Sequence, residues 1–408
     1  MKNIKVVIGG NFGDEGKGLM TDYFCSQVKG QKVVNIRYNG TCQAGHTVVR
    51  NGLRHVFSHI GSGSFNPNIT TFLSSDFYVN PILFNEEYQK ILNMGIKSDI
   101  KVDENAHVVL IFDILLNRLS EVSRGLDKHG SCGLGLWEAI LRERAGYSFV
   151  VSDFFDRPTE LYKKIKGMLD NYYVPTYMKR FNKTKEDAYS LVVESVPFYD
   201  DLVISTYIDE IKKMLSIVEV CTEDSIINSF DNFVFEGAQG LLLDWGNREY
   251  MPHLTASYTG LKNVVPMLKK FKINDTRLEI CYVSRSYMTR HGAGKFNTEV
   301  ENKEILGLTE VDKTNVFNNW QGNIRYGYLD LELLKQSVDK DLAYLEEYKG
   351  EYLKSLCITH LNETNNKLKC SCGDVDCEKL KEIFTGFYLY YSYSESTEDK
   401  DLTKNVGF

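Results

Sequence analysis

The spacing of apolar and polar residues near the N-terminus predicts a strand, a loop, a helix and a second strand. Residues 4–10 are a short β-branched run that ends in two glycines, which is typical of a buried strand entering a turn. Residues 19–30 place apolar side chains at helical spacing and end at a glycine, and residues 32–40 predict the second strand. This order is typical of a mostly parallel sheet with helices on its faces.

The rest of the chain continues this α/β pattern. Further strands are predicted at residues 107–113, 232–237, 278–286, 355–361 and 387–393. Residues 150–230 predict mainly helix, and the polar, cysteine-bearing residues 363–380 predict a surface excursion. Because neither a repeat nor a low-complexity linker divides the chain, we expect one α/β domain over residues 1–408 with a mainly helical insertion at about 150–230.

Charge and cysteine content narrow the class of protein. The net charge is −7 and no basic stripe occurs, which disfavours a nucleic-acid-binding scaffold. No apolar run reaches the ~20 residues of a membrane helix, and the N-terminus lacks the pattern of a signal peptide. The nine cysteines are odd in number and mostly scattered, which suits a reducing compartment. We therefore expect a cytoplasmic protein without membrane contact, and small anionic substrates stay open.

A glycine-rich loop lies between the first strand and the first helix. Residues 13–18 read Gly-Asp-Glu-Gly-Lys-Gly, and glycines let backbone N–H groups approach phosphate oxygens. The spacing is not that of a standard P-loop, and Gly18 stands where a metal-binding Ser or Thr would be, so Asp14 is the candidate oxygen ligand. The candidate nucleotide contacts are Gly13, Glu15, Gly16, Lys17 and Gly18. The alternative is a tight turn with a solvated Asp-Glu pair.

A second polar segment follows the second strand at the same edge of the predicted sheet. Residues 43–47 read Gln-Ala-Gly-His-Thr. A histidine beside a phosphate-binding loop could stabilise a transferring phosphoryl group. Taken alone, His46 would more often be a structural residue.

Five motifs, in order, resemble those of the adenylosuccinate synthetases. They are residues 10–18 with 43–49, residues 103–125, residues 236–244, residues 282–299 and residues 327–330. The resemblance covers most of residues 1–330 and weakens over about 331–408. It implies a large, mostly parallel central sheet flanked by helices and related to the P-loop NTPases. It also implies a homodimeric C–N ligase that uses Mg²⁺ and a nucleoside triphosphate to join a purine nucleoside monophosphate to aspartate.

The resemblance assigns roles to individual residues. Asp14 would be the general base at N1 of the purine and, together with the carbonyl of Gly45, a magnesium ligand. His46 would assist transfer of the γ-phosphate to the purine 6-oxygen. Further nucleotide contacts would be Thr47 and Asn362, and the substrate contacts would be Gln43, Ser131, Arg144, Gln239, Thr255, Thr298 and Arg325. Arg144 would reach the substrate of the partner subunit, although Arg142 lies close enough in sequence to leave the register open.

The segment that reads the nucleotide base departs from the family. Residues 359–362 read Thr-His-Leu-Asn, where the family has Thr-Lys-x-Asp. An aspartate accepts two hydrogen bonds from guanine, whereas the Asn362 amide offers one acceptor and one donor, which suits adenine. We therefore expect ATP or dATP rather than GTP. The alternative is that Asn362 is a plain strand-end residue, and Ser394 and Thr397 are further candidates for lining the base site.

The amino-acid loop also departs from the family. Residues 314–325 retain Arg325 alone, although the two carboxylates of aspartate normally favour several bidentate arginines. Aspartate is the default substrate, with a smaller or neutral amino acid left open. Asp14 is kept, whereas the resembling phage enzymes that act on dGMP carry a small hydroxyl residue there, so we expect IMP or dIMP.

Two other functions and one metal site stay open. The functions are a phage-type 2-aminoadenylosuccinate synthetase that uses dGMP and ATP, and a purine-nucleotide-binding paralogue without turnover. Cys370, Cys372 and Cys377 could bind zinc together with His360. Structural zinc favours four ligands in paired spacing, so a loop with free thiols is the preferred interpretation.

Overall fold

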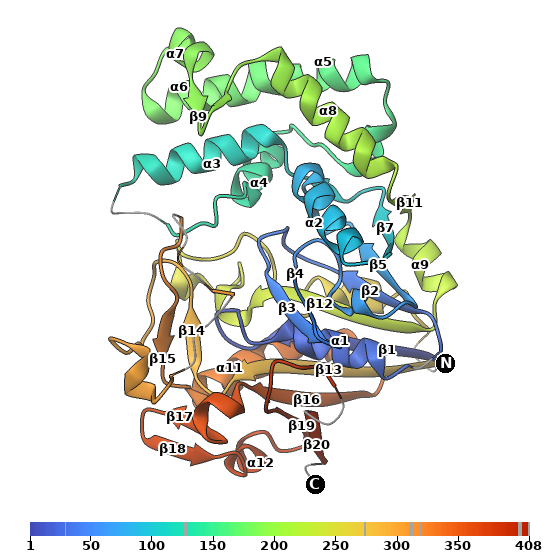
Figure 1. Ribbon diagram of the computed structural model, residues 1–408, viewed down its shortest axis with the longest axis vertical. Coiled ribbons are helices and arrows are strands. Elements are labelled where there is room, and N and C mark those ends of the chain that lie inside the picture. The colour runs from blue at the N-terminus through green and yellow to red at the C-terminus, as the bar shows by residue number, and fades with distance from the viewer. Residues whose placement is uncertain are drawn as a thin grey trace.

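The computed structural model describes residues 1–28, 30–125, 129–272, 275–309, 314, 315, 317, 320–398 and, as backbone, 402–406. Ten strands form one central sheet (Figure 1). From edge to edge they are β11 (Glu219–Cys221), β7 (Asp99–Asp103), β5 (Ile69–Leu73), β2 (Val33–Arg37), β12 (Asn232–Gly240), β1 (Lys2–Gly9), β13 (Thr276–Arg285), β16 (Tyr352–Thr359), β19 (Phe387–Ser392) and β20 (Leu402–Val406). Neighbours pair in parallel except β19 and β20, which are antiparallel. The predicted mostly parallel α/β fold is confirmed.

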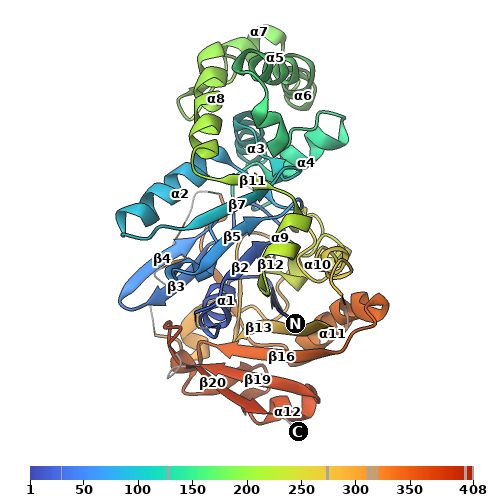
Figure 2. The same ribbon diagram turned by 90° about the vertical axis from the view of Figure 1, so that its right-hand side faces the viewer.

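Helices flank this sheet and build a separate layer at one end of the molecule. They are α1 (Lys17–Ser26), α2 (Pro81–Asn93), α3 (Ile111–Ser123), α4 (Leu136–Arg144), α5 (Pro158–Met168), α6 (Val174–Phe181), α7 (Lys185–Ser190), α8 (Asp201–Leu215), α9 (Glu223–Ser229), α10 (Val264–Leu268), α11 (Leu331–Leu342) and α12 (Lys379–Ile383). Helices α5 to α8 lie beyond α3 and α4, farthest from the sheet (Figures 1 and 2). Within the described chain, no helix combines the length and apolar character that a membrane crossing requires.

Short strand pairs lie outside the central sheet. They are β3 (His46–Arg50) with β4 (Leu53–Phe57), β6 (Tyr78–Val79) with β8 (His107–Val108), β9 (Val192–Val193) with β10 (Val196–Pro197), β14 (Met288–Arg290) with β15 (Arg325–Gly327), and β17 (Lys367–Cys370) with β18 (Gly373–Asp376). The β3–β4 hairpin packs against α1, which sets the first residue of β3 close to the glycine-rich loop.

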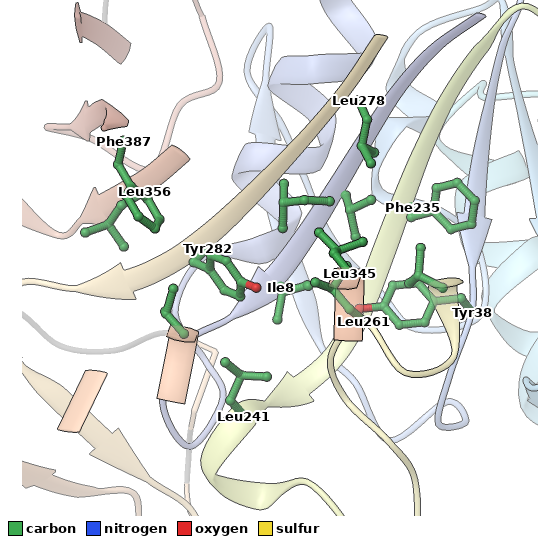
Figure 3. Packing of buried hydrophobic residues seen from close by; sticks show 14 of the residues in the cluster. Ile8, Tyr38, Phe235, Leu241, Leu261, Leu278, Tyr282, Leu345, Leu356 and Phe387 are labelled. Atoms are coloured by element: carbon green, nitrogen blue, oxygen red, sulfur yellow. The ribbon is translucent and has the colours of Figure 1, made fainter. Parts of the chain in front are cut away.

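Strand β1 lies near the centre of the sheet with both of its faces buried. Ile4, Val6 and Ile8 join the large cluster on the side of α10 and α11, whereas Val7 joins the cluster on the side of α1. This division follows from the two-residue repeat of a strand. Figure 3 shows Ile8 and Phe235 of β12 within the first cluster. Burial of each such side chain stabilises the fold by about 1.5–3 kcal/mol, so the loop after β1 is attached to a rigid floor.

The strand predicted over residues 107–113 was wrong. Only His107 and Val108 form a strand, and α3 begins at Ile111. The Asp113 carboxylate accepts a hydrogen bond from the backbone N–H of Leu110 at 2.8 Å, which stabilises the first turn of the helix. Apolar periodicity alone does not separate a short buried strand from the start of a buried helix.

The surface excursion predicted over residues 363–380 is a folded one: this segment forms the β17–β18 hairpin, leads into α12 and leaves most of its residues exposed or half-buried. Leu368 and Leu380 are fully buried and anchor it against the large cluster. Two apolar residues among many polar ones were too weak a signal for a folded hairpin.

Candidate functional site

The glycine-rich loop connects β1 to α1 in a strained conformation. Gly13, Asp14 and Gly16 all have positive φ angles, of 99°, 61° and 96°. Glycine adopts this conformation without strain, but aspartate does so at a cost. The carbonyl of Asp14 accepts a hydrogen bond from Nε of Arg285 at 2.5 Å, which holds the aspartate in this position. Arg285 is the last residue of β13, beside β1 in the sheet, so the sheet itself fixes the loop.

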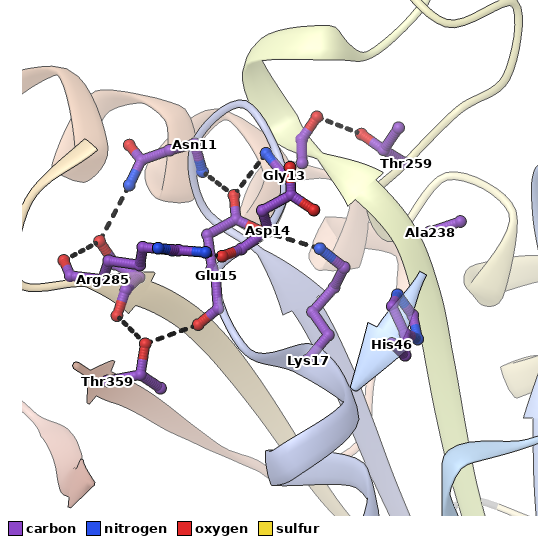
Figure 4. Close-up of polar contacts among 12 residues, drawn as sticks. Asn11, Gly13, Asp14, Glu15, Lys17, His46, Ala238, Thr259, Arg285 and Thr359 are labelled. Carbon is purple, nitrogen blue, oxygen red and sulfur yellow. Dashed lines mark hydrogen bonds and ion pairs between the residues drawn. The ribbon is translucent and has the colours of Figure 1, made fainter. Parts of the chain in front are cut away.

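Glu15 braces the loop from inside (Figure 4). Its Oε1 accepts hydrogen bonds from the backbone N–H groups of Asn11 and Gly13 at 2.9 and 2.8 Å. Its Oε2 accepts one from Nζ of Lys17 at 2.8 Å, and both side chains are 2% exposed. The carboxylate of Glu15 is therefore bonded to other groups of the same loop, and it is the counter-ion of Lys17.

The end of β16 lies against the same loop. The hydroxyl of Thr359 donates a hydrogen bond to the carbonyl of Glu15 at 2.7 Å, and its methyl group packs near Gly16. Asn362 follows three residues later on an exposed turn. The segment expected to read the nucleotide base thus begins at the expected phosphate loop.

His46 begins β3 and pairs with a buried carboxylate. Its Nδ1 contacts Oε1 of Glu236, which also accepts a hydrogen bond from the Ser62 hydroxyl, and Arg37 lies 3.9 Å from the same oxygen. Burial would raise the pKa of Glu236, but Arg37, His46 and Ser62 outweigh it and lower that pKa to about 2. Burial lowers the pKa of His46, and Arg37 and Lys17 lower it further against the opposing effect of Glu236. Neutral His46 therefore donates Nδ1–H to the Glu236 anion.

A cavity of about 400 Å³ opens between these segments and the loops that follow α3 and β12. The predicted site residues that line it are Gly13, Asp14, Lys17, Gln43, Gly45, His46, Ser131, Gln239 and Thr255. The predicted site residues outside its lining are Glu15, Gly16, Gly18, Thr47, Arg144, Thr298, Arg325 and Asn362. The two segments proposed for phosphate chemistry, residues 13–18 and 43–47, thus line the same cavity as Ser131, Gln239 and Thr255, which were proposed to bind the monophosphate.

The side of the cavity away from the glycine-rich loop is polar. Nε2 of Gln43 donates to the hydroxyl of Thr255 at 3.0 Å, and the Ser131 hydroxyl bonds the Asn117 amide at 3.0 Å. Gln239 holds a positive φ of 64° at the end of β12. Hydroxyl and amide groups in this arrangement can accept and donate bonds to the phosphate and sugar of a nucleotide.

The comparisons with known proteins agree with this arrangement. The sequence model of the adenylosuccinate synthetase family matches residues 6–356. This chain belongs to the adenylosuccinate synthetase family. The adenylosuccinate synthetase of Mesoplasma florum is 31% identical over 341 residues, which cover 82% of this chain and 74% of that relative. As a member of the family, the chain is a C–N ligase.

Two solved structures share the fold. The fully ligated adenylosuccinate synthetase of Plasmodium falciparum superposes with a TM-score of 0.71 at 15% identity and covers 99% of this chain and 100% of its own. The succinoaminodeoxyadenylate synthetase of cyanophage S-2L, bound to dGMP and dATP, gives a TM-score of 0.62 at 15% identity and covers 99% and 95%. At these identities the likeness concerns the fold alone.

The structure separates the two arginines that the family resemblance left ambiguous. Arg142 is fully buried; its guanidinium donates to the carboxylate of Asp113, at 3.2 Å, and to the carbonyls of Val108 and Tyr147. Arg144 is exposed and lies over the ring of Trp245, 5.5 Å from its centroid. Arg142 therefore stabilises the fold around α4, whereas Arg144 is the one of these two arginines that this adenylosuccinate synthetase family member exposes at its surface.

Two residues predicted to contact a ligand have partners within the chain. Arg325 forms a two-pronged ion pair with Glu299 and donates to the carbonyls of Gly292 and Gly294 at 3.0 and 2.9 Å. Thr397 is fully buried and donates to Asp22. Both side chains are thus held by partners within the chain, and their contact with a ligand stays a prediction.

Residues that the sequence did not single out complete the cavity. His291 lies with Nε2 3.3 Å from Oδ2 of Asp14, and Asn117 anchors the Ser131 loop. Trp245 and Trp137 form an aromatic wall with ring centroids 5.2 Å apart. His291 directly follows β14 within a family motif, which was the available signal, but its contact depends on strand packing that the motif does not reveal.

The cysteine-bearing segment carries no metal cluster in the described part of the chain. Cys370 is buried, Cys372 is exposed and Cys377 is half-buried. No group of three or more His, Cys, Asp or Glu side chains suited to a metal ion occurs among the described residues. The zinc hypothesis therefore gains no support from this geometry.

Proposed function

We propose that this chain condenses IMP or dIMP with L-aspartate to form an N6-succinopurine nucleotide, driven by a nucleoside triphosphate and with ATP or dATP preferred over GTP. The observation that carries the proposal is that Asp14, Lys17 and His46 line one cavity next to the polar residues expected to hold the monophosphate. The purine 6-oxygen can therefore meet a base and a phosphoryl donor in the same space.

Asp14 acts as the general base. It takes the proton from N1 of the purine, and the electron pair moves onto the 6-oxygen, which attacks the γ-phosphorus. The bond between the 6-oxygen and phosphorus forms while the bond from phosphorus to the bridging oxygen breaks, which releases the nucleoside diphosphate. The neutral amine of aspartate then attacks C6, the bond from C6 to the 6-oxygen breaks, and phosphate departs together with the proton that the amine nitrogen loses. A placed base contributes roughly 10²–10⁴-fold to such a step.

His46 assists at the transferring phosphoryl group. Its Nδ1–H is bonded to Glu236, so Nε2 becomes a donor only when the imidazole takes up a proton. The negative charge of a bound triphosphate favours that protonation, and the Glu236 anion stabilises the resulting imidazolium. The buried pair thus supplies positive charge when the phosphates are bound.

The oxygen donors in the cavity fit Mg²⁺. The Asp14 carboxylate and the Gly45 carbonyl both belong to cavity-lining residues, and Mg²⁺ usually takes one or two protein oxygens together with water and substrate phosphates. When bound, Mg²⁺ would neutralise charge on the transferring phosphoryl group. Asp14 and Gly45 are the residues that would hold it.

The retained carboxylate at Asp14 and the amide at Asn362 support the proposed substrates. Hypoxanthine carries a hydrogen at C2, so the base at N1 has no 2-amino group to accommodate. An amide at Asn362 matches the donor and acceptor of adenine better than those of guanine. For the amino acid, the cavity offers Thr314, Asn315 and Gln321 rather than loop arginines. We propose that these neutral groups and the loop backbone hold aspartate.

The exposed position of Arg144 supports a homodimer in which this side chain reaches the substrate of the partner subunit. A cytoplasmic location stays a prediction.

The test crosses substrates in one plate. Purified protein with Mg²⁺ and aspartate receives ATP, dATP or GTP against IMP, dIMP and dGMP, and mass spectrometry detects the succinylated nucleotide. Product from IMP or dIMP with ATP or dATP is expected. Product from dGMP alone would replace the proposal with the activity suggested by the cyanophage enzyme. Nucleotide binding without product or phosphate release in any well would reject catalysis with aspartate.

A further inference from the structure

We propose that His291 is a positioning residue for Asp14 and connects this general base to the amino-acid loop; the proposal rests on the proposed function. The imidazole Nε2 lies 3.3 Å from Oδ2 of Asp14 and 3.1 Å from Oδ1 of Asn315. Both neighbours of Nε2 are acceptor oxygens, so the proton of the neutral ring belongs on Nε2. The resulting N–H donates to Asn315 and faces the Asp14 carboxylate.

The backbone on both sides of this contact is held in place. Phe12 lies two residues before Asp14, and Arg290 lies one residue before His291. The guanidinium of Arg290 stacks on the ring of Phe12, and its central carbon is 4.4 Å from the ring centroid. Arg290 is 1% exposed and donates to the carbonyls of His253, at 3.0 Å, and Lys295. A buried cation–π contact of this kind contributes about 2 kcal/mol. The distance between Asp14 and His291 is therefore set by packing rather than by chance side-chain approach.

Asp14 needs such a partner because its loop position alone does not orient the carboxylate. The carbonyl of Asp14 is bonded to Arg285, but this fixes the backbone and leaves rotation about χ1 and χ2. The contact with His291 engages Oδ2 and leaves Oδ1 to accept the proton. Misplacement of a reacting group by 1 Å is enough to lower a rate about 100-fold.

The contact with Asn315 gives His291 a second role. Asn315 belongs to the amino-acid loop, and both residues line the cavity. Because one N–H faces two acceptors, an amino acid that competes for the Asn315 amide changes how strongly His291 holds Asp14. The orientation of the base is in this way linked to the presence of the second substrate.

The first test separates positioning from packing. His291→Leu removes the donor, whereas His291→Gln keeps an N–H near the position of Nε2. With saturating IMP, ATP and aspartate, we expect kcat of the leucine variant to fall about 10- to 100-fold and the glutamine variant to recover most of it. KM values and calorimetric affinity for IMP should stay within about threefold of the original, since ground-state binding is retained.

A matched control uses another histidine beside a carboxylate. His107 contacts Glu143 at 3.0 Å outside the cavity lining, so His107→Leu should leave kcat unchanged. The proposal is overturned if His291→Leu keeps kcat within about twofold, or if leucine and glutamine variants lose kcat and IMP affinity equally.

A second measurement is independent of turnover. Long-range ¹H–¹⁵N spectra of protein labelled at histidine report which ring nitrogen carries hydrogen, and the His291 signals are assigned by their loss in His291→Gln. We expect the Nε2–H form and a changed Nε2 shift in Asp14→Asn. An Nδ1–H form would overturn the proposal even if the ligase is active. If the chain is inactive, an Nε2–H form that responds to Asp14→Asn still supports the contact, so the two failures are distinguishable.

Discussion

Nζ of Lys17 lies 2.8 Å from Oε2 of Glu15, and the two side chains are almost completely enclosed. The ammonium group of Lys17, which is expected to bind a phosphate, is thus already paired with the carboxylate of Glu15. A buried pair is costly to break from one side, because the remaining charge has neither water nor a partner. A bound triphosphate can supply the replacement.

Glu15→Gln tests this exchange. The amide oxygen can still accept the two loop N–H groups, but Lys17 loses its counter-ion. We expect the free energy of unfolding to fall by about 3 kcal/mol, measured in urea. The rise in Tm on adding triphosphate should be larger than in the original chain. Asp209→Asn breaks the exposed pair with Lys212, also 2.8 Å long, and should change stability by less than about 0.5 kcal/mol. Equal losses in both variants would argue against the buried pair.

Gly18→Ala should separate His46 from the loop. A Cβ at residue 18 would lie 2.9 Å from Cβ of His46 and 3.1 Å from the carbonyl oxygen of Thr47. The hairpin must move to make room, so we expect kcat to fall about 100-fold and stability to fall by about 1–3 kcal/mol. Steady-state kinetics and urea unfolding check this. Gly167→Ala in α5 meets no atom within 4 Å and should be neutral or stabilising, with unchanged kcat.

Arg142 and Arg144 should respond in opposite ways to alanine substitution. Arg142→Ala leaves the carboxylate of Asp113 buried without its partner, so the free energy of unfolding should fall by about 3–5 kcal/mol. Arg144→Ala removes an exposed side chain, so stability should change by less than about 0.5 kcal/mol while activity falls. Thermal unfolding and product formation measured on both variants decide the register. Full activity in Arg144→Ala would remove the argument for a shared site.

Asp341 should make stability fall as pH rises. It is buried on α11, where it accepts hydrogen bonds from the Leu261 N–H and the Tyr282 hydroxyl, both at 2.9 Å. Burial raises the pKa of this carboxyl from 3.8 to about 7. The folded chain therefore binds the extra proton between pH 3.8 and about 7, and stability is lost as pH rises through that window.

Asp341→Asn should remove the part of the pH dependence of stability that comes from the titration of this carboxyl. Urea unfolding at pH 5 and pH 7.5 is the measurement, and the decline in unfolding free energy between the two should be smaller in the variant. The same decline in both proteins would show that Asp341 does not titrate in this range.

The site residues that could be predicted from the sequence lie in short continuous motifs. Asp14, Lys17 and His46 each lie in a short segment whose residue types suit phosphate chemistry, and the structure brings these segments to one cavity. Six strands of the central sheet, β1, β2, β12, β13, β16 and β19, were also predictable, because strands buried on both faces are apolar runs; the sequence did not reveal β5, β7, β11 or β20.

Side-chain pairing was beyond the reach of the sequence, both within a loop and between distant segments. Glu15 was expected to face the nucleotide, but the carboxylate turns inward because the loop's own N–H groups need an acceptor. Arg325 was expected at the substrate, but in the structure it pairs with Glu299, which lies 26 residues earlier, between β14 and β15. The partner of His291 likewise depends on where β14 packs. Each case turns on pairing that only the folded chain defines.

The order of strands has a consequence for synthesis. Asn3 in β1 is paired on one side with Asn232 and on the other with Arg277. At ribosomal rates the first strand is complete roughly 10–50 seconds before either neighbour is made. Throughout that interval the hydrogen-bonding edges of β1 lack the strands that pair with them in the finished sheet. A premature stop before residue 232 would release a product whose first strand has no neighbour in the sheet and is prone to aggregate.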